Sequence, residues 1–202
     1  MKMSRSKTNN VIVYSDDKIS QKKGNFSKDI QHILEDENTV EISFDTHPDP
    51  YHYIMWLFPL TDVKYVKVYL YDSDIAKGEF AKKGFCGLCD IDSNMLFIAK
   101  DRVKGKISID EIMVHELLHY VALNECGVRM SDTYEEYFAY ANSLQYFVHK
   151  GWKEKDIIFI YLLPYFKRIC KKGMAKKEAT QFFNQYVNAE MPVGKNTFLN
   201  IL

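Results

Sequence analysis

Residues 109–127 of the chain read IDEIMVHELLHYVALNECG and contain HELLH at 115–119. In an α-helix, residues four apart lie on the same face, so His115 and His119 can direct two imidazole nitrogens at one point. Glu116, about 100° around the helix axis from His115, sits beside that point without being a ligand. The pattern predicts a zinc-binding helix whose glutamate acts on a water molecule next to the metal.

The surrounding residues favour a helix over a chance match. Ser108 and Glu111 have capping-box spacing, and Cys126-Gly127 offers an end, so we expect a helix over about 109–125. The chain has only six histidines, and a chance match of this kind has odds on the order of one in a hundred. The competing interpretation is a solvated face of histidine and glutamate on a surface helix.

Three further helices are expected after this one. The first begins at Asp132, where Glu135 follows three residues later, and runs to Lys150-Gly151. The other two cover about 153–171 and 175–189; Pro164 is expected to kink the former, and Gly173 separates them.

The first half of the chain has strand-like segments rich in β-branched and aromatic residues. They are expected at 11–14, 40–44, 63–71, 84–90 and 95–99, with turns at 46–50 and 91–94. Strands first and helices afterwards indicate an α+β fold. We expect one domain over residues 1–202, with its sheet within 30–100, its helices within 108–202, and residues 1–28 loosely attached.

A catalytic zinc needs a third protein ligand and an open position. The metzincin extension of the motif requires glycine and histidine at positions that are Ala122 and Glu125 here, so that pattern is excluded. Glu125 cannot substitute readily, because on a continuing helix it lies roughly 9 Å beyond His119 along the axis. A glutamate from the following helix is the other option, and Glu135 and Glu136 both qualify.

HELLH followed by Glu136-Tyr137-Phe138-Ala139 resembles the gluzincin-type zinc metallopeptidases of the HExxH zincin superfamily, in a short, minimal form. The resemblance covers about residues 84–150. It implies a zincin-like fold and hydrolysis of a peptide bond. It also implies Zn²⁺ held by His115, His119 and Glu136, with Glu116 as general base. Tyr140 stands where many members carry an aspartate or asparagine.

The same resemblance implies two further features of the cleft. An edge strand borders it, and an extended peptide can add to that strand; residues 95–99 are the candidate. A tyrosine or histidine stabilises the developing oxyanion, and the candidates, among which we do not choose, are Tyr134, Tyr137, Tyr140 and His149.

Helix capping gives a reason to choose between the two candidate glutamates. Glu135, three residues after Asp132, has a local use in closing a capping box, which frees Glu136 for the metal. Glu136 is therefore preferred as the third ligand, and Glu135 is retained as the alternative.

Other readings of the motifs remain open. The fold could keep zinc for stability or serve as a catalytically silent binding protein, or the enzyme could be a zinc amidohydrolase acting on a non-peptide substrate. An intact Glu116 argues against a silent fold, since structural zinc needs no water-activating carboxylate. Cys86-Gly87-Leu88-Cys89 would need a second pair of thiols to form a zinc site, so we interpret it as two thiols in a hairpin.

Composition restricts the partners. The 202 residues include 27 Lys and Arg and 27 Asp and Glu, so zero net charge gives no global case for nucleic acid or membrane. The apolar runs at 53–60 and 157–166 are shorter than the roughly 20 residues that span a bilayer. No apolar segment follows the basic start, so we expect a cytoplasmic protein with reduced cysteines and a peptide or protein substrate. The oligomeric state stays open.

Overall fold

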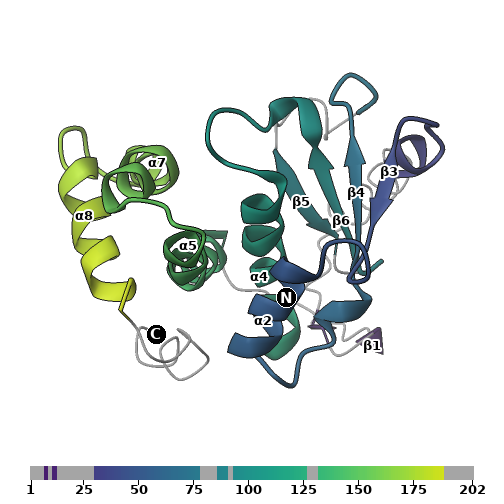
Figure 1. The fold of residues 1–202 in the computed structure, drawn as a ribbon, viewed down its shortest axis with the longest axis horizontal. Coiled ribbons are helices and arrows are strands. Elements are labelled where there is room, and N and C mark those ends of the chain that lie inside the picture. Colours follow the sequence, from purple (N-terminus) through teal and green to yellow (C-terminus); the bar gives the residue numbers. More distant parts are fainter. Residues whose placement is uncertain are drawn as a thin grey trace, which may run out of the picture.

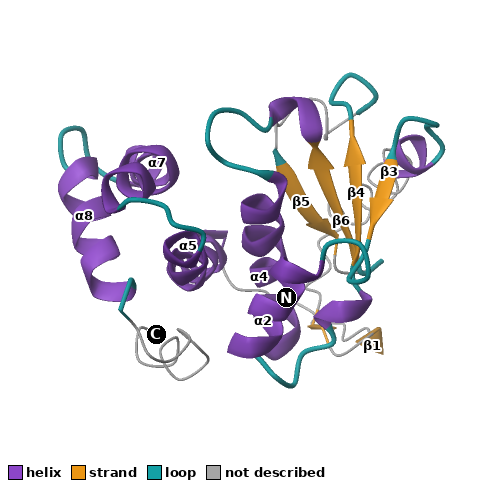
Figure 2. Cartoon of the chain, viewed as in Figure 1, coloured by secondary structure: helices purple, strands orange, loops and turns teal. Residues whose placement is uncertain are grey.

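A computed structural model describes residues 7–8, 11–12, 30–77, 86–90, 93–126 and 132–188. Its fold class is α+β, as expected, with a small mixed sheet beside a group of helices (Figures 1 and 2). Two short strands, β1 (Lys7–Thr8) and β2 (Val11–Ile12), pair with each other apart from the main sheet. Otherwise the expected loose segment at 1–28 lies outside the described residues, as does the end of the expected strand at 11–14.

The main sheet has four strands in the order β3-β4-β6-β5. They are β3 (Val40–Ile42), β4 (Lys67–Tyr71), β5 (Gly87–Asp90) and β6 (Met95–Ala99). β4 is antiparallel to β3 and parallel to β6, while β5 and β6 form the expected antiparallel hairpin, with Asp90 opposite Met95.

Strand β6 therefore pairs on both sides, and the expectation that residues 95–99 form an edge strand is wrong. The outer strand on this side of the sheet is β5. The first part of the expected strand at 63–71 is instead a 3-10 turn at Val63–Tyr65. β6 is central because its parallel partner β4 comes from earlier in the chain, with Lys67 opposite Met95, a pairing that local patterns do not encode.

Alternation along the strands gives the sheet two apolar faces. One face, with Val68, Leu70, Leu96 and Ile98, packs against helix α4 (Ile109–Cys126). The other, with Tyr69, Tyr71, Phe97 and Ala99, packs against Ile30 and Ile33 of the helical segment 30–34. The sheet thus holds α4 firmly along one face.

Helix α4 begins as its sequence predicts. The backbone N–H of Ser108 donates to Oε2 of Glu111 at 2.6 Å, the reciprocal bond of a capping box. Oε1 of the same carboxylate accepts a hydrogen bond from the indole N–H of Trp152 at 3.0 Å, which ties the start of α4 to the turn after α5.

An unexpected helix, α2 (Pro48–Leu57), packs beside α4. The turn expected at 46–50 leads directly into it: His47 precedes the helix, Pro48 opens it and Asp49 lies in its first turn. Proline is favoured at the first helical position because its missing N–H would be unpaired there anyway. The sheet part of the chain therefore contains a helix that the sequence analysis missed.

Helix α5 (Asp132–His149) packs on α4 and lies between it and the remaining helices (Figure 1). These are α6 (Glu154–Asp156), a π-helix (Ile157–Leu162), α7 (Leu163–Ile169) and α8 (Ala175–Tyr186). The irregularity expected at Pro164 takes the form of the π-helical turn before it. No helix in the described ranges is long and apolar enough to cross a membrane.

Candidate metal centre

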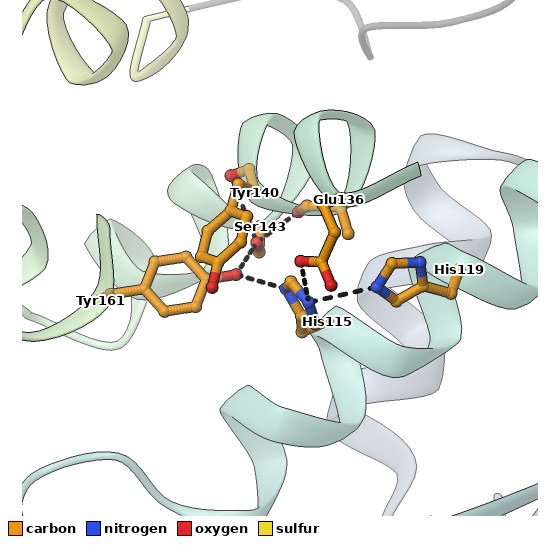
Figure 3. A network of polar contacts seen from close by, with 7 residues as sticks. His115, His119, Glu136, Tyr140, Ser143 and Tyr161 are labelled. Atoms are coloured by element: carbon orange, nitrogen blue, oxygen red, sulfur yellow. Dashed lines mark hydrogen bonds and ion pairs between the residues drawn. The ribbon is translucent and has the colours of Figure 1, made fainter. Parts of the chain in front are cut away.

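The candidate site lies between α4 and α5 (Figure 3). His115 and His119 project from consecutive turns of α4, as their spacing predicts. Glu136 faces them from α5, with Tyr140 and Ser143 on the same face of that helix because residues four and three apart share a side. Within the part of the chain that the structure describes, His115, His119 and Glu136 are the one group of metal-ligating side chains found, with donor atoms all within 4.8 Å of one another.

The two donor separations that involve His115 fit a tetrahedral ion. Nε2 of His119 lies 3.2 Å from Nε2 of His115, and Oε2 of Glu136 lies 3.6 Å from Nε2 of His115. Two atoms bound at 2.0–2.1 Å to a tetrahedral zinc lie about 3.3–3.4 Å apart. Two imidazoles and one carboxylate are also a donor set that zinc prefers and that leaves a fourth position open. The residues present therefore fit this ion.

The electrostatics of His119 and Glu136 suit a cation. Burial, followed by the charge of His115, lowers the pKa of His119 to about 3, so this imidazole is neutral at pH 7. Burial raises the pKa of Glu136, but the contact with His115 and the charges nearby outweigh it and hold the pKa below its usual value. A neutral imidazole and a carboxylate are the protonation states that bind metal.

Glu116 lies beside the group and is not a member of it. Burial raises the pKa of this carboxyl to about 7 against the opposing effect of His115, with a smaller contribution from the charge of Glu136. A pKa near 7 is where a general base works best at neutral pH. The backbone of Gly87 in β5 comes so close that a Cβ there would lie 2.5 Å from Oε1 of Glu116. The outer strand thus borders the glutamate.

Sequence reasoning missed two residues of this site. Nδ1 of His115 lies 2.8 Å from the hydroxyl of Tyr161, which comes from the π-helix, and that hydroxyl lies 2.5 Å from Oγ of Ser143 (Figure 3). Ser143 shares the face of Glu136 at a helical spacing of seven, which was a usable signal. Tyr161 is 46 residues from His115, and nothing in the local sequence points to it.

The residues proposed to stabilise an oxyanion differ in their position relative to the metal-ligating group. The ring of Tyr140 packs edge-on against His115, with centroids 4.8 Å apart. The hydroxyl of Tyr137 is 2.5 Å from that of Tyr186 in the helical core. His149 is the last residue of α5, about 20 Å along the axis from Glu136. The side chain of Tyr134 lies outside the described residues. Tyr140 is the nearest of the described candidates to His115.

Glu135 differs from its neighbour. Burial, and after it the charges of Glu116, Asp90 and Glu135, raise the pKa of the Cys89 thiol. Glu135 is not in the donor group with His115 and His119. The expected capping contact between Glu135 and Asp132 involves the side chain of Asp132, which lies outside the part of the chain that the structure describes.

Cys86 and Cys89 face different surroundings. Cys89 packs against the core between the sheet and α4, whereas Cys86 is exposed and its thiol donates to the carbonyl of Arg102 at 3.6 Å. Residues three apart on an extended segment point to opposite faces, so the geometry does not bring these thiols together.

Comparison of the chain with protein-family models, curated proteins and solved structures found no match. The site therefore rests on its own geometry.

Proposed function

We propose that this protein is a zinc-dependent metallopeptidase with a zincin-like fold, in which His115, His119 and Glu136 hold the metal. The observation that carries the proposal is the convergence of three donor atoms from α4 and α5, all within 4.8 Å of one another. The two separations that involve His115 are close to those around a tetrahedral zinc, and Glu116 is the next residue along α4. The order of elements supports the proposal: the hairpin of outer strand β5 and inner strand β6 precedes the helix with both histidines, and the helix with the glutamate follows.

Bound zinc would supply a Lewis acid that polarises a carbonyl and acidifies water. Glu116 would take the proton of the attacking water and later give it to the leaving amine. A carboxyl with its pKa raised to about 7 is suited to both transfers. Tyr140 is the oxyanion candidate that we favour, because its ring packs against that of the proposed ligand His115.

We propose that the substrate binds along the outer strand β5. It pairs with β6 on one side, and its backbone passes Glu116 at Gly87. An extended peptide that added to the other side of β5 would lie along the reacting groups, since main-chain hydrogen bonds hold a peptide at a sheet edge. Strand β5 thus replaces residues 95–99 as the proposed peptide-binding strand, because residues 95–99 form the internal strand β6.

The test is the zinc content of the full chain purified without added metal, followed by hydrolysis of an unfolded protein mixture. We expect about one zinc per chain, sharply reduced in His119→Ala. Glu116→Gln should keep the zinc and lose hydrolysis. Full zinc retention in His119→Ala would contradict the proposed metal site. Unchanged hydrolysis in Glu116→Gln would contradict the proposed mechanism. Zinc without hydrolysis in the unmodified protein would favour a structural metal.

A further inference from the structure

A buried chain of polar contacts leads away from His115 (Figure 3). Nδ1 of His115 lies 2.8 Å from Oη of Tyr161, Oη lies 2.5 Å from Oγ of Ser143, and Oγ lies 2.5 Å from the carbonyl oxygen of Ala139. Tyr161 is 8% exposed and Ser143 is fully buried. The groups must therefore satisfy one another.

The donor and the acceptor of each hydrogen bond follow from the last group in this series, the carbonyl of Ala139. The carbonyl of Ala139 can only accept, and two oxygens at 2.5 Å without a proton between them would repel each other, so Ser143 donates its proton there. The proton between Ser143 and Tyr161 must then belong to Tyr161. With that proton used, the hydroxyl of Tyr161 can only accept from His115.

We infer that Tyr161 is a positioning residue that holds His115 with its proton on Nδ1 and the lone pair of Nε2 turned toward His119 and Glu136. The inference rests on the proposed function in one respect: zinc is the group that the lone pair would meet. A histidine that binds metal commonly donates its other N–H to a carboxylate, a carbonyl or a water, which fixes the ring and its tautomer. Here a tyrosine hydroxyl from a distant helix has this role.

The surroundings make Tyr161 suited to orienting a ring. Its own ring packs against Phe147 and Tyr140, with centroids 4.2 Å and 4.7 Å away, so the hydroxyl is held on a rigid side chain. Tyr161 also lies in the π-helix Ile157–Leu162, and single π-turns inside helices occur frequently at functional sites.

The experiment compares Tyr161→Phe with Tyr186→Phe in the full chain. Both side chains are 8% exposed, and both hydroxyls contact another hydroxyl, but only Tyr161 reaches His115. Zinc affinity is measured by competition with a chelator. The tautomer of His115 is read from the ¹⁵N chemical shifts of its imidazole in metal-free protein. Ser143→Ala, which leaves the Tyr161 ring in place, serves as a second variant.

We expect Tyr161→Phe to weaken zinc binding about 10–100-fold and to abolish the preference for the Nδ1–H tautomer. Tyr186→Phe should leave both at wild-type values, and Ser143→Ala should shift both in the direction of Tyr161→Phe. Wild-type affinity and tautomer in Tyr161→Phe would overturn the inference even if the protein binds zinc. If the unmodified protein binds no zinc, the proposed function fails, but the tautomer in Tyr161→Phe still decides whether Tyr161 positions His115.

Discussion

Gly87 in the outer strand and Glu116 on α4 are in such close contact that position 87 has no space for a side chain: a Cβ atom would lie 2.5 Å from Oε1 and 2.7 Å from Cγ of Glu116. The glycine is therefore required by the carboxylate and not by the strand. This contact couples the edge of the sheet to the proposed general base.

Gly87→Ala should displace the Glu116 carboxylate and leave the three proposed ligands in place. We expect wild-type zinc content, loss of hydrolysis, and a decrease of about 1–3 kcal/mol in the free energy of unfolding from overpacking. Zinc analysis, hydrolysis of an unfolded protein and denaturant unfolding measure the three effects.

The double variant Gly87→Ala/Glu116→Ala is the control for this route. If the methyl group acts by clashing with the Glu116 side chain, Gly87→Ala should lower the free energy of unfolding less in the Glu116→Ala background than in the unmodified protein, because changes at two residues in contact are not additive. Full activity in Gly87→Ala would contradict the proposed position of the base.

The neighbours Glu135 and Glu136 should differ in their effect on zinc. They differ by about 100° around the helix, and only Glu136 joins the donor group with His115 and His119. Glu136→Ala should weaken zinc binding by more than the about 10–100-fold typical of residues that merely support a ligand. Glu135→Ala should keep the wild-type affinity. Competition with a chelator measures both affinities. If Glu135→Ala weakens zinc binding and Glu136→Ala does not, the third ligand is Glu135.

The local signals in the sequence predicted the elements that carry the motif. Capping at Ser108 and the four-residue spacing of the histidines predicted α4. The strand-like segments on both sides of the turn at 91–94 predicted the hairpin of β5 and β6. Non-local features were missed. Strand β6 is central because a distant strand pairs with it, and Tyr161 reaches His115 only after the helical part folds back. Helix α2 was missed because a proline next to Asp49 favours a turn as well as a helix start.

An ion pair joins the start of α2 to the turn after α5. Nζ of Lys150 lies 2.8 Å from Oδ2 of Asp49, and their hydrogen bond lowers the pKa of Asp49 and raises that of Lys150. The pair therefore stabilises fully between the usual Asp pKa of 3.8 and the usual Lys pKa of 10.5. It loses its contribution as the pH falls through the lowered pKa of Asp49 or rises through the raised pKa of Lys150. Because both groups are partly exposed, we expect only about 0.2–1 kcal/mol.

A double-mutant cycle with Asp49→Asn and Lys150→Met measures this coupling from urea unfolding. The coupling energy should be present at pH 7 in low salt, decrease at high salt through screening, and vanish in acid. A coupling energy that is insensitive to both salt and acid would show that the pair acts through packing and not through charge.

Pro164 explains the wide turn that presents Tyr161. Proline has no N–H, and its ring clashes with the carbonyl four residues earlier, here that of Ile160. The N–H of Leu163 correspondingly bonds to the carbonyl of Ile158, five residues back. Pro164→Ala removes the clash and restores a donor, so we expect the segment to become a regular α-helix. Closing a π-turn, with its bonds five residues back, to an α-turn, with bonds four residues back, rotates the residues before it by about 100° relative to α7. This rotation withdraws the Tyr161 hydroxyl from His115.

Pro164→Ala should therefore weaken zinc binding in the same direction as Tyr161→Phe, while the free energy of unfolding holds or rises. Pro48→Ala, at the first position of α2 and away from the metal centre, is the matched control and should leave zinc affinity unchanged. Chelator competition and denaturant unfolding of both variants separate the two effects. If Pro164→Ala keeps both the zinc affinity and the His115 tautomer of the unmodified protein, packing of the Tyr161 ring, and not the proline, sets the position of this hydroxyl.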